Sequence, residues 1–79
     1  MLNETEILKI LTKIFREIFD DNTLIPNNDT TAGDIALWDS LTHMILIDII
    51  ENKLAIKFSF EEVVNFYTVG DLVKCIENK

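Results

Sequence analysis

Apolar residues recur at helical spacing through most of this 79-residue sequence, and this pattern restricts the possible folds more than any other feature. In residues 4–19 the apolar positions follow the spacing of an amphipathic helix. Asn3 and Glu6 have the spacing of a capping box, which marks a helix start. The same signals predict four helices in all: over residues 4–19, over residues 40–54, a short one from Ser59 and a last one from Thr68.

A long segment, residues 20–39, separates the first two predicted helices. Turn-forming residues and Pro26 dominate its first half, and loops of this length are often functional. Its apolar residues are expected to anchor it on the helices: Leu24, Ile25, Ile35, Leu37 and Trp38. Residues 55–58 could form a short strand, but they have no second strand as a partner. The sequence therefore predicts an all-α fold, a four-helix bundle in a single domain over residues 1–79 with a long first connection and a short third helix.

Charge narrows the possible partners. Fourteen acidic and seven basic residues give a net charge of −7, which disfavours nucleic acid and anionic membranes and favours basic protein surfaces. The alternative is that the acidity only keeps a small protein soluble. No apolar run approaches the roughly 20 residues that span a bilayer, and the acidic amino terminus lacks the basic start of a signal peptide. We therefore expect a cytoplasmic monomer. His43 and Cys75 are the only residues of their types, so neither a metal cluster nor an internal disulfide is expected.

The predicted helix over residues 40–54 carries more apolar surface than a small core can absorb. One stripe on a helical wheel is the expected core stripe, with Leu46, Ile47, Ile50 and Leu54. A second apolar group lies on roughly the opposite side and shares that side with two acids: Leu41, Met44 and Ile45 with Asp48 and Glu51. Such a patch usually marks a binding surface. The alternative is that the long loop folds over it.

The patch begins at a recognisable motif. Trp38-Asp39-Ser40-Leu41 resembles the phosphopantetheine-attachment motif of acyl and peptidyl carrier proteins, in which Asp-Ser-Leu opens the second helix. The order of the predicted helices and the long first loop are also similar to that family. So are the segments Asp34-Ile35 and Lys57-Phe58-Ser59, so the resemblance covers essentially the whole chain.

The resemblance implies a carrier with no catalytic role of its own. Ser40 would receive 4'-phosphopantetheine from coenzyme A through a phosphopantetheinyl transferase, and Asp39 would help to position that enzyme. The arm would then carry acyl, aminoacyl or peptidyl thioesters from a loading ligase to downstream enzymes. Ser40 is also a candidate N-cap, and a helix N-terminus favours an anionic phosphate. The partner face implied by the resemblance is Leu41, Met44, Asp48 and Glu51, with Glu61 and Glu62 as weaker candidates. The apolar patch adds Ile45 to this face.

The sequence departs from carriers of fatty-acid synthesis at two positions near the serine. Those carriers typically read Asp-Ser-Leu-Asp-x-Val-Glu-Leu, whereas Thr42 and Ile45 here replace the two later acids. The Trp-Asp-Ser-Leu-Thr-His form is more similar to discrete carriers of specialised pathways. These include surface-polysaccharide, aminoacyl-transfer and secondary-metabolite systems.

Three alternatives compete with the carrier interpretation. A hydrolase could use Asp39, Ser40 and His43, but neither glycine of the chain lies beside Ser40 to form an oxyanion hole. Ser40 could serve only as a helix cap. An unmodified helical adaptor would use the same apolar patch to bind a partner protein.

Overall fold

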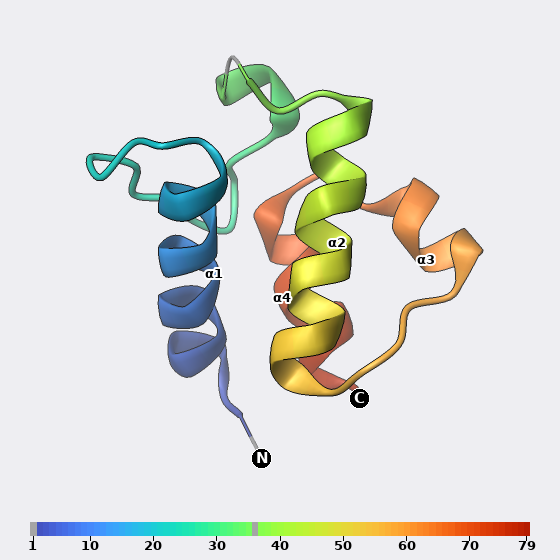
Figure 1. Ribbon diagram of the computed structural model, residues 1–79. Helices are drawn as coiled ribbons and strands as arrows, with labels where there is room; N and C mark the ends of the chain where they lie inside the picture. Colours follow the sequence, from blue (N-terminus) through green and yellow to red (C-terminus); the bar gives the residue numbers. More distant parts are fainter. Residues whose placement is uncertain (1, 36) are drawn as a thin grey trace.

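The computed structural model describes residues 2–35 and 37–79, and these residues form α-helices joined by loops (Figure 1). The elements are α1 (Glu4–Ile18), the 3-10 helix η1 (Ala32–Asp34), α2 (Ser40–Leu54), α3 (Phe60–Asn65) and α4 (Val69–Glu77). No strand occurs among the described residues, and residues 55–58 are irregular. The all-α prediction, with its long first loop and short third helix, is confirmed. None of the described helices is long and apolar enough to cross a membrane.

Three helices, α1, α3 and α4, begin where their capping residues predict. Asn3 and Glu6 form a capping box at α1, since the Asn3 side chain accepts from the Glu6 N–H and the Glu6 carboxylate accepts from the Asn3 N–H. The same reciprocal pairing starts α3 at Ser59 and α4 at Thr68. Each box satisfies backbone N–H groups that have no partner inside the helix.

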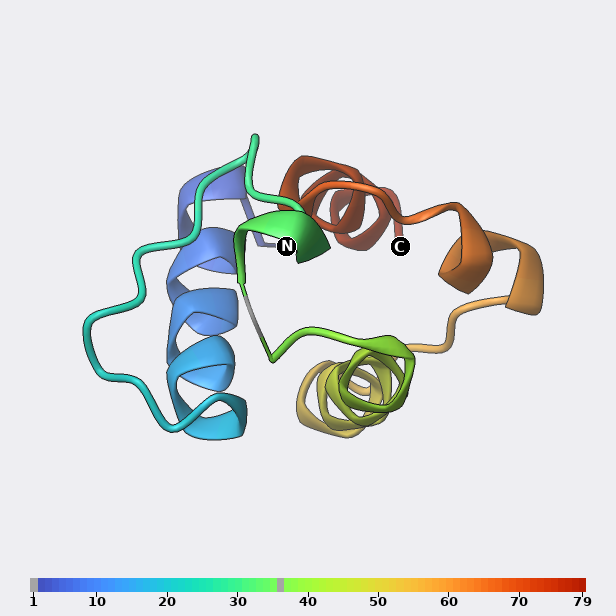
Figure 2. The ribbon, with the colours of Figure 1, turned by 90° about the horizontal axis from the view of Figure 1, so that it is seen from above.

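The core lies where α1 packs against α2 and α4, and α3 lies on the side of the bundle away from α1 (Figure 2). From α2 the buried residues are Leu46, Ile47 and Ile50, which confirms the predicted core stripe. Leu54 is only partly buried and packs at the edge of the core. The core residues from α1 and α4 are Ile7, Leu11, Ile14, Phe15, Val69, Leu72, Val73 and Ile76.

The long loop is anchored by fewer apolar residues than predicted. Ile35 and Trp38 are buried, and Leu24 packs partly against the core. Ile25 and Leu37 are exposed, so their predicted role as anchors is wrong. Leu37 lies in a turn closed by the hydrogen bond from the Trp38 N–H to the Ile35 carbonyl, at 3.0 Å. Turns run over the protein surface, so the Leu37 side chain faces solvent.

Hydrogen bonds join the loop to the start of α4. The backbone N–H of Val69 donates to the Thr30 carbonyl and that of Gly70 to the Asn28 carbonyl, each at 2.9 Å. Thr31 and Thr68 form an isolated antiparallel bridge beside them. Loop carbonyls thus satisfy N–H groups in the first turn of α4, which otherwise lack a helical partner.

Candidate functional site

Ser40 is the first residue of α2, and Asp39 is the residue that caps the helix. The Asp39 carboxylate accepts from the Thr42 N–H at 2.9 Å, and the Thr42 hydroxyl accepts from the Asp39 N–H at 2.8 Å. The same hydroxyl donates to the Leu37 carbonyl at 2.9 Å. The prediction of Ser40 as the N-cap is therefore wrong. Thr42 stabilises Asp39 as the cap by bonding to its backbone from the third position of the helix.

The cap leaves Ser40 available for reaction. Ser40 is exposed, and its hydroxyl takes no part in the hydrogen bonds that join Leu37, Asp39 and Thr42. The hydrogen bond from the Thr42 N–H lowers the pKa of Asp39 below its ordinary value, because it stabilises the carboxylate form. The site thus places a free hydroxyl beside a carboxylate at the positive end of a helix.

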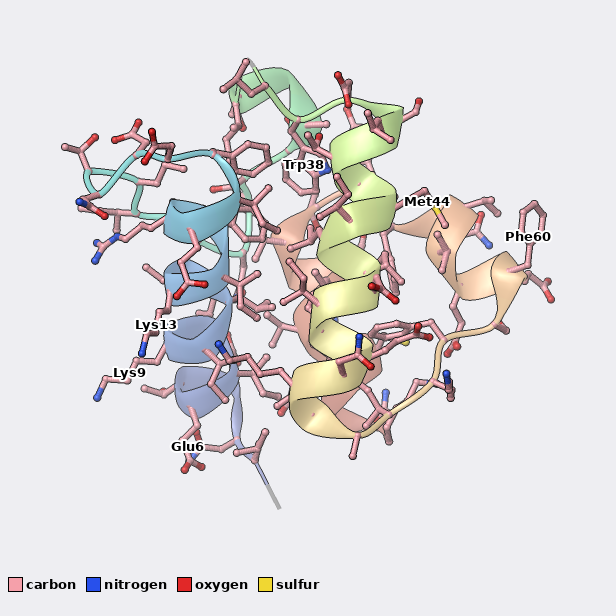
Figure 3. The ribbon with its side chains drawn as sticks, viewed as in Figure 1. Glu6, Lys9, Lys13, Trp38, Met44 and Phe60 are labelled. Atoms are coloured by element: carbon pink, nitrogen blue, oxygen red, sulfur yellow. The ribbon has the colours of Figure 1, made fainter. Side chains whose placement is uncertain are left out.

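Ser40 also lines an open groove of about 530 Å³ between the start of α2 and α3. Other lining residues are Trp38, His43, Met44, Val63, Phe66 and Tyr67. In Figure 3, Met44 projects from α2 toward α3, whereas Trp38 lies near the loop above α2. The groove therefore starts at the serine and has an apolar and aromatic lining.

A hydrogen-bonded chain runs along this groove through His43. The Trp38 indole N–H donates to His43 Nδ1 at 3.1 Å, and His43 Nε2 lies 3.2 Å from the Val63 carbonyl oxygen. An indole N–H can only donate, so Nδ1 is the acceptor and the neutral ring carries its proton on Nε2. His43 therefore donates to Val63 and links the loop, α2 and α3. Because both ring nitrogens have partners other than Ser40, His43 is not oriented as the general base that the hydrolase alternative needs.

The predicted apolar patch on α2 is exposed. Leu41 is 71% exposed, Met44 56% and Ile45 43%, so the loop does not cover them. Asp48 is exposed next to them in sequence, but Glu51 is half-buried and its carboxylate accepts from the Phe58 N–H at 2.8 Å. Glu51 therefore has a structural contact that sequence reasoning missed.

On α3 and the turn after it, three further apolar residues are exposed, namely Phe60, Val64 and Tyr67. The sequence did not predict this exposed apolar group. A six-residue helix shows too little of its period to separate a buried from an exposed face.

Glu62 differs from Glu61 in its surroundings. Glu61 is exposed, whereas Glu62 accepts from the Cys75 thiol at 3.0 Å and from the Lys79 ammonium at 3.0 and 3.1 Å. These contacts and the Ser59 N–H, with the thiol contributing most, lower the pKa of Glu62 from 4.5 to about 2. Burial, and next the Glu62 carboxylate, raise the pKa of Cys75 to about 11. Glu62 thus joins α3 to α4, and Cys75 stays an unreactive thiol.

No group of His, Cys, Asp and Glu side chains in residues 2–35 and 37–79 is arranged to hold a metal ion. Beside the groove lie the exposed Ser40 hydroxyl and the neighbouring Asp39 carboxylate.

Comparisons with known proteins place this arrangement in a family. No protein-family model and no curated protein sequence matches the chain. Among solved structures, the chain is similar to the solution NMR structure of a holo acyl carrier protein from Geobacter metallireducens, with 42% sequence identity and a TM-score of 0.87. The match covers 92% of this chain and 84% of that one, so fold and sequence agree over nearly the whole of both. The chain belongs to the acyl carrier protein family.

Proposed function

We propose that the chain carries 4'-phosphopantetheine on Ser40 and uses it to pass acyl, aminoacyl or peptidyl groups between enzymes. The observation that supports this most is the exposed Ser40 hydroxyl within Asp39-Ser40-Leu41, at the first position of α2. The solved relative is a holo acyl carrier protein. Acyl carrier proteins are carriers and not enzymes, so partner enzymes perform the chemistry.

The residues around Ser40 suit the attachment of this group. The Ser40 oxygen forms a bond to the phosphorus that bears pantetheine in coenzyme A, the pyrophosphate P–O bond breaks, and adenosine 3',5'-bisphosphate leaves. The modifying transferase takes the hydroxyl proton. The N-terminus of α2 favours the resulting phosphodiester through its dipole, and the exposed position admits a large enzyme. When bound, the group supplies a terminal thiol that carries cargo as a thioester.

Intact mass spectrometry tests the proposal after incubation with coenzyme A and a broad-specificity transferase. We expect one phosphopantetheine mass gain, located by peptide mapping on Ser40 and abolished by Ser40→Ala. Ser59→Ala is the matched control, because Ser59 also starts a helix but its hydroxyl accepts from the Glu62 N–H. A gain that survives Ser40→Ala would contradict the site. The absence of any gain would favour the unmodified adaptor.

We further propose that the carrier serves a specialised pathway and not housekeeping fatty-acid synthesis. Thr42 and Ile45 support this, since they stand where fatty-acid carriers typically have acids. Thr42 is used in the helix cap, and Ile45 extends the exposed apolar patch, so this face offers less charge to a basic partner. We expect a malonyl transferase of fatty-acid synthesis to load the holo protein slowly and to load Ile45→Glu faster. Rapid loading of the wild-type protein would contradict the assignment.

A further inference from the structure

The Thr42 hydroxyl has both a donor and several acceptors as neighbours. Three oxygen atoms lie near it: the Leu37 carbonyl oxygen at 2.9 Å, the Asp39 carbonyl oxygen at 3.1 Å and an Asp39 carboxylate oxygen at 3.2 Å. The Asp39 backbone nitrogen lies 2.8 Å away and donates to it. To satisfy these neighbours, the side chain at position 42 has to accept one hydrogen bond and also donate one.

Serine and threonine meet both requirements with a single atom. A hydroxyl oxygen accepts through its lone pairs and donates its one hydrogen, which goes to the nearest acceptor, the Leu37 carbonyl. A carboxylate could accept from the Asp39 N–H, but it would donate nothing and would bring a second negative charge toward the Asp39 carboxylate. The geometry therefore favours a hydroxyl at position 42 over the acid that is typical of fatty-acid carriers.

The bonds of Thr42 hold the chain on the amino-terminal side of Ser40. The Leu37 carbonyl belongs to a turn in which the Trp38 N–H donates to the Ile35 carbonyl at 3.0 Å. The Trp38 side chain is buried in the core. The Thr42 hydroxyl joins this turn to the first turn of α2, so Ser40 lies between two fixed points of the backbone.

Burial does not fix the conformation of residues 37–40, because Leu37, Asp39 and Ser40 are all exposed. Without the Thr42 hydroxyl, the segment would lose two hydrogen bonds and would sample more conformations. If a partner binds only one conformation, its apparent affinity falls in proportion to the fraction of chains that have that conformation. Once the complex has formed, the rate of the chemical step is unchanged.

We propose that Thr42 is a positioning residue for the transfer of phosphopantetheine to Ser40. Its hydroxyl keeps residues 37–40 in the conformation that the transferase binds, and it acts through hydrogen bonds to Leu37 and Asp39 without touching the reacting atoms. This inference rests on the proposed modification of Ser40 and goes further by naming a residue that controls how the transferase recognises the carrier.

Kinetics of the transfer reaction with coenzyme A and the broad-specificity transferase separate binding from chemistry. Thr42→Val keeps the shape of the side chain but removes its hydroxyl. We expect the KM for the carrier to rise about two- to tenfold and kcat to stay within about twofold of the wild-type value. Thr42→Ser keeps the hydroxyl and should have the wild-type KM.

Thr42→Asp tests the donated bond separately, because a carboxylate can accept from the Asp39 N–H but cannot donate to the Leu37 carbonyl. The assay uses about 1 M salt, where the Debye length is about 3 Å and steering by the added charge is screened. We expect the KM of this variant to exceed that of the wild type. A KM at or below the wild-type value would overturn the inference, since donation to Leu37 would then be dispensable.

Asn3→Ala is the matched control for a general loss of stability. Asn3 caps α1, which begins at the end of the bundle opposite the start of α2 (Figure 1). Loss of this cap destabilises the fold, as loss of the Thr42 hydroxyl does. It should leave the KM for the carrier at the wild-type value.

NMR of the unmodified protein tests the same segment with no transferase present. In Thr42→Val, we expect lower backbone order parameters over residues 37–40 and faster hydrogen exchange of the Asp39 amide than in the wild type. Thr42→Ser and Asn3→Ala should match the wild type at these residues.

The outcomes separate this inference from the proposed function. A wild-type KM in Thr42→Val, or a fall in kcat with no change in KM, overturns the positioning role and leaves the modification of Ser40 intact. Absence of a mass gain in the wild-type protein overturns the proposed function and this inference with it.

Discussion

Thr42 shows how one side chain at the start of α2 organises the residues around it. Its hydroxyl accepts from the Asp39 N–H and donates to the Leu37 carbonyl, while its own N–H binds the Asp39 carboxylate. These bonds hold the chain on both sides of Ser40 without using the Ser40 hydroxyl. Thr42, which stands where fatty-acid carriers typically have an acid, therefore has a structural role in the helix cap.

Gly70 offers a test of the contact between the loop and α4. A Cβ atom at this position would lie 2.8 Å from the Asn28 carbonyl oxygen, a backbone atom that cannot rotate away. Alanine favours a helix over glycine by about 1 kcal/mol, but overpacking costs about 1–3 kcal/mol, so we expect Gly70→Ala to lower the free energy of unfolding. Urea denaturation measures the change.

Gly33→Ala is the matched control for this prediction. Its Cβ would meet only the Thr31 hydroxyl oxygen, at 3.5 Å, which is an ordinary contact. We expect a change within about 0.5 kcal/mol. Equal stability of the two variants would show that the approach of Asn28 to α4 is not tight.

At this scale the sequence predicted the place of Ser40 but not its surroundings. Turn formers before it and apolar spacing after it mark a helix start. Asp39 and Ser40 are both good caps, so the choice between them depends on Thr42 reaching back, which is a matter of side-chain geometry. The contact between Glu62 and Cys75 joins residues 13 positions apart in different helices and left no local signal.

Among the helices, α3 is the one that depends most on contacts with its neighbours. It has six residues, and a helix this short is unstable alone. His43 of α2 donates to the Val63 carbonyl, and Glu51 of α2 accepts from the Phe58 N–H just before α3. Glu62 binds α4 through Cys75. The position of α3, and with it the width of the groove, is therefore set by these side chains.

The contacts of Glu62 predict a specific acid sensitivity. Its pKa is about 2 in the folded protein against 4.5 ordinarily, so its contribution to stability is complete above about pH 4.5 and is lost as the pH falls toward 2. Glu62→Gln removes this contribution. We expect the free energy of unfolding to fall less steeply with decreasing pH in the variant, as measured by urea denaturation across this range.

Glu61→Gln is the control for this acid sensitivity, since Glu61 is an exposed neighbour on the same helix. It should keep the wild-type slope. If Glu62→Gln kept that slope as well, the ionised Glu62 would not be what holds α3 to α4.

The exposed face of α2 predicts a division of labour in transferase docking. Asp48→Lys should slow association and weaken its dependence on salt, because exposed charges mainly steer encounter. Met44→Ala should speed dissociation, because apolar contacts mainly hold a complex. Asp48 is preferable to Glu51 here, since Glu51 also binds the Phe58 N–H. The assay follows transfer of the arm to Ser40 against salt.

Glu17→Lys is the matched charge reversal for the docking test, because Glu17 is exposed on α1. It should leave the transfer rate close to that of the wild type. Folded Asp48→Lys and Met44→Ala proteins that are modified at the wild-type rate at every salt concentration would exclude this face as the dock.

At the scale of the whole molecule, two isoleucines of α2 differ in how much of the side chain is buried. Ile50 has no exposed surface and Ile45 is 43% exposed. We expect Ile50→Ala to reduce the free energy of unfolding by about 2–5 kcal/mol, because it leaves a cavity in the core. The same change at Ile45 should cost less than about 1 kcal/mol, as is usual for surface positions. Similar losses at both sites would mean that the faces of α2 are misassigned.

The fold was more predictable than the path of its loop. Amphipathic spacing is a strong signal over the length of α1 or α2, so the helices and the core stripe of Ile47 and Ile50 followed from it. An irregular segment has no fixed period, and hydrophobicity alone did not distinguish the buried Trp38 from the exposed Leu37. The ring contacts of His43 with Trp38 and Phe66 were not predicted either, because they join residues from the loop, α2 and the segment after α3.

The bonds from Val69 and Gly70 to the Thr30 and Asn28 carbonyls also bear on the order of events during synthesis. Translation produces the chain from its amino terminus, so Ser40 leaves the ribosome before α4 does. Until α4 arrives, those loop carbonyls lack their partners, and α1 and α2 lack one wall of the core. In a nascent chain, Ser40 is therefore exposed before the loop that precedes it has formed its hydrogen bonds to α4. A transferase that recognises the folded conformation of this loop would distinguish a fully synthesised carrier from a nascent chain.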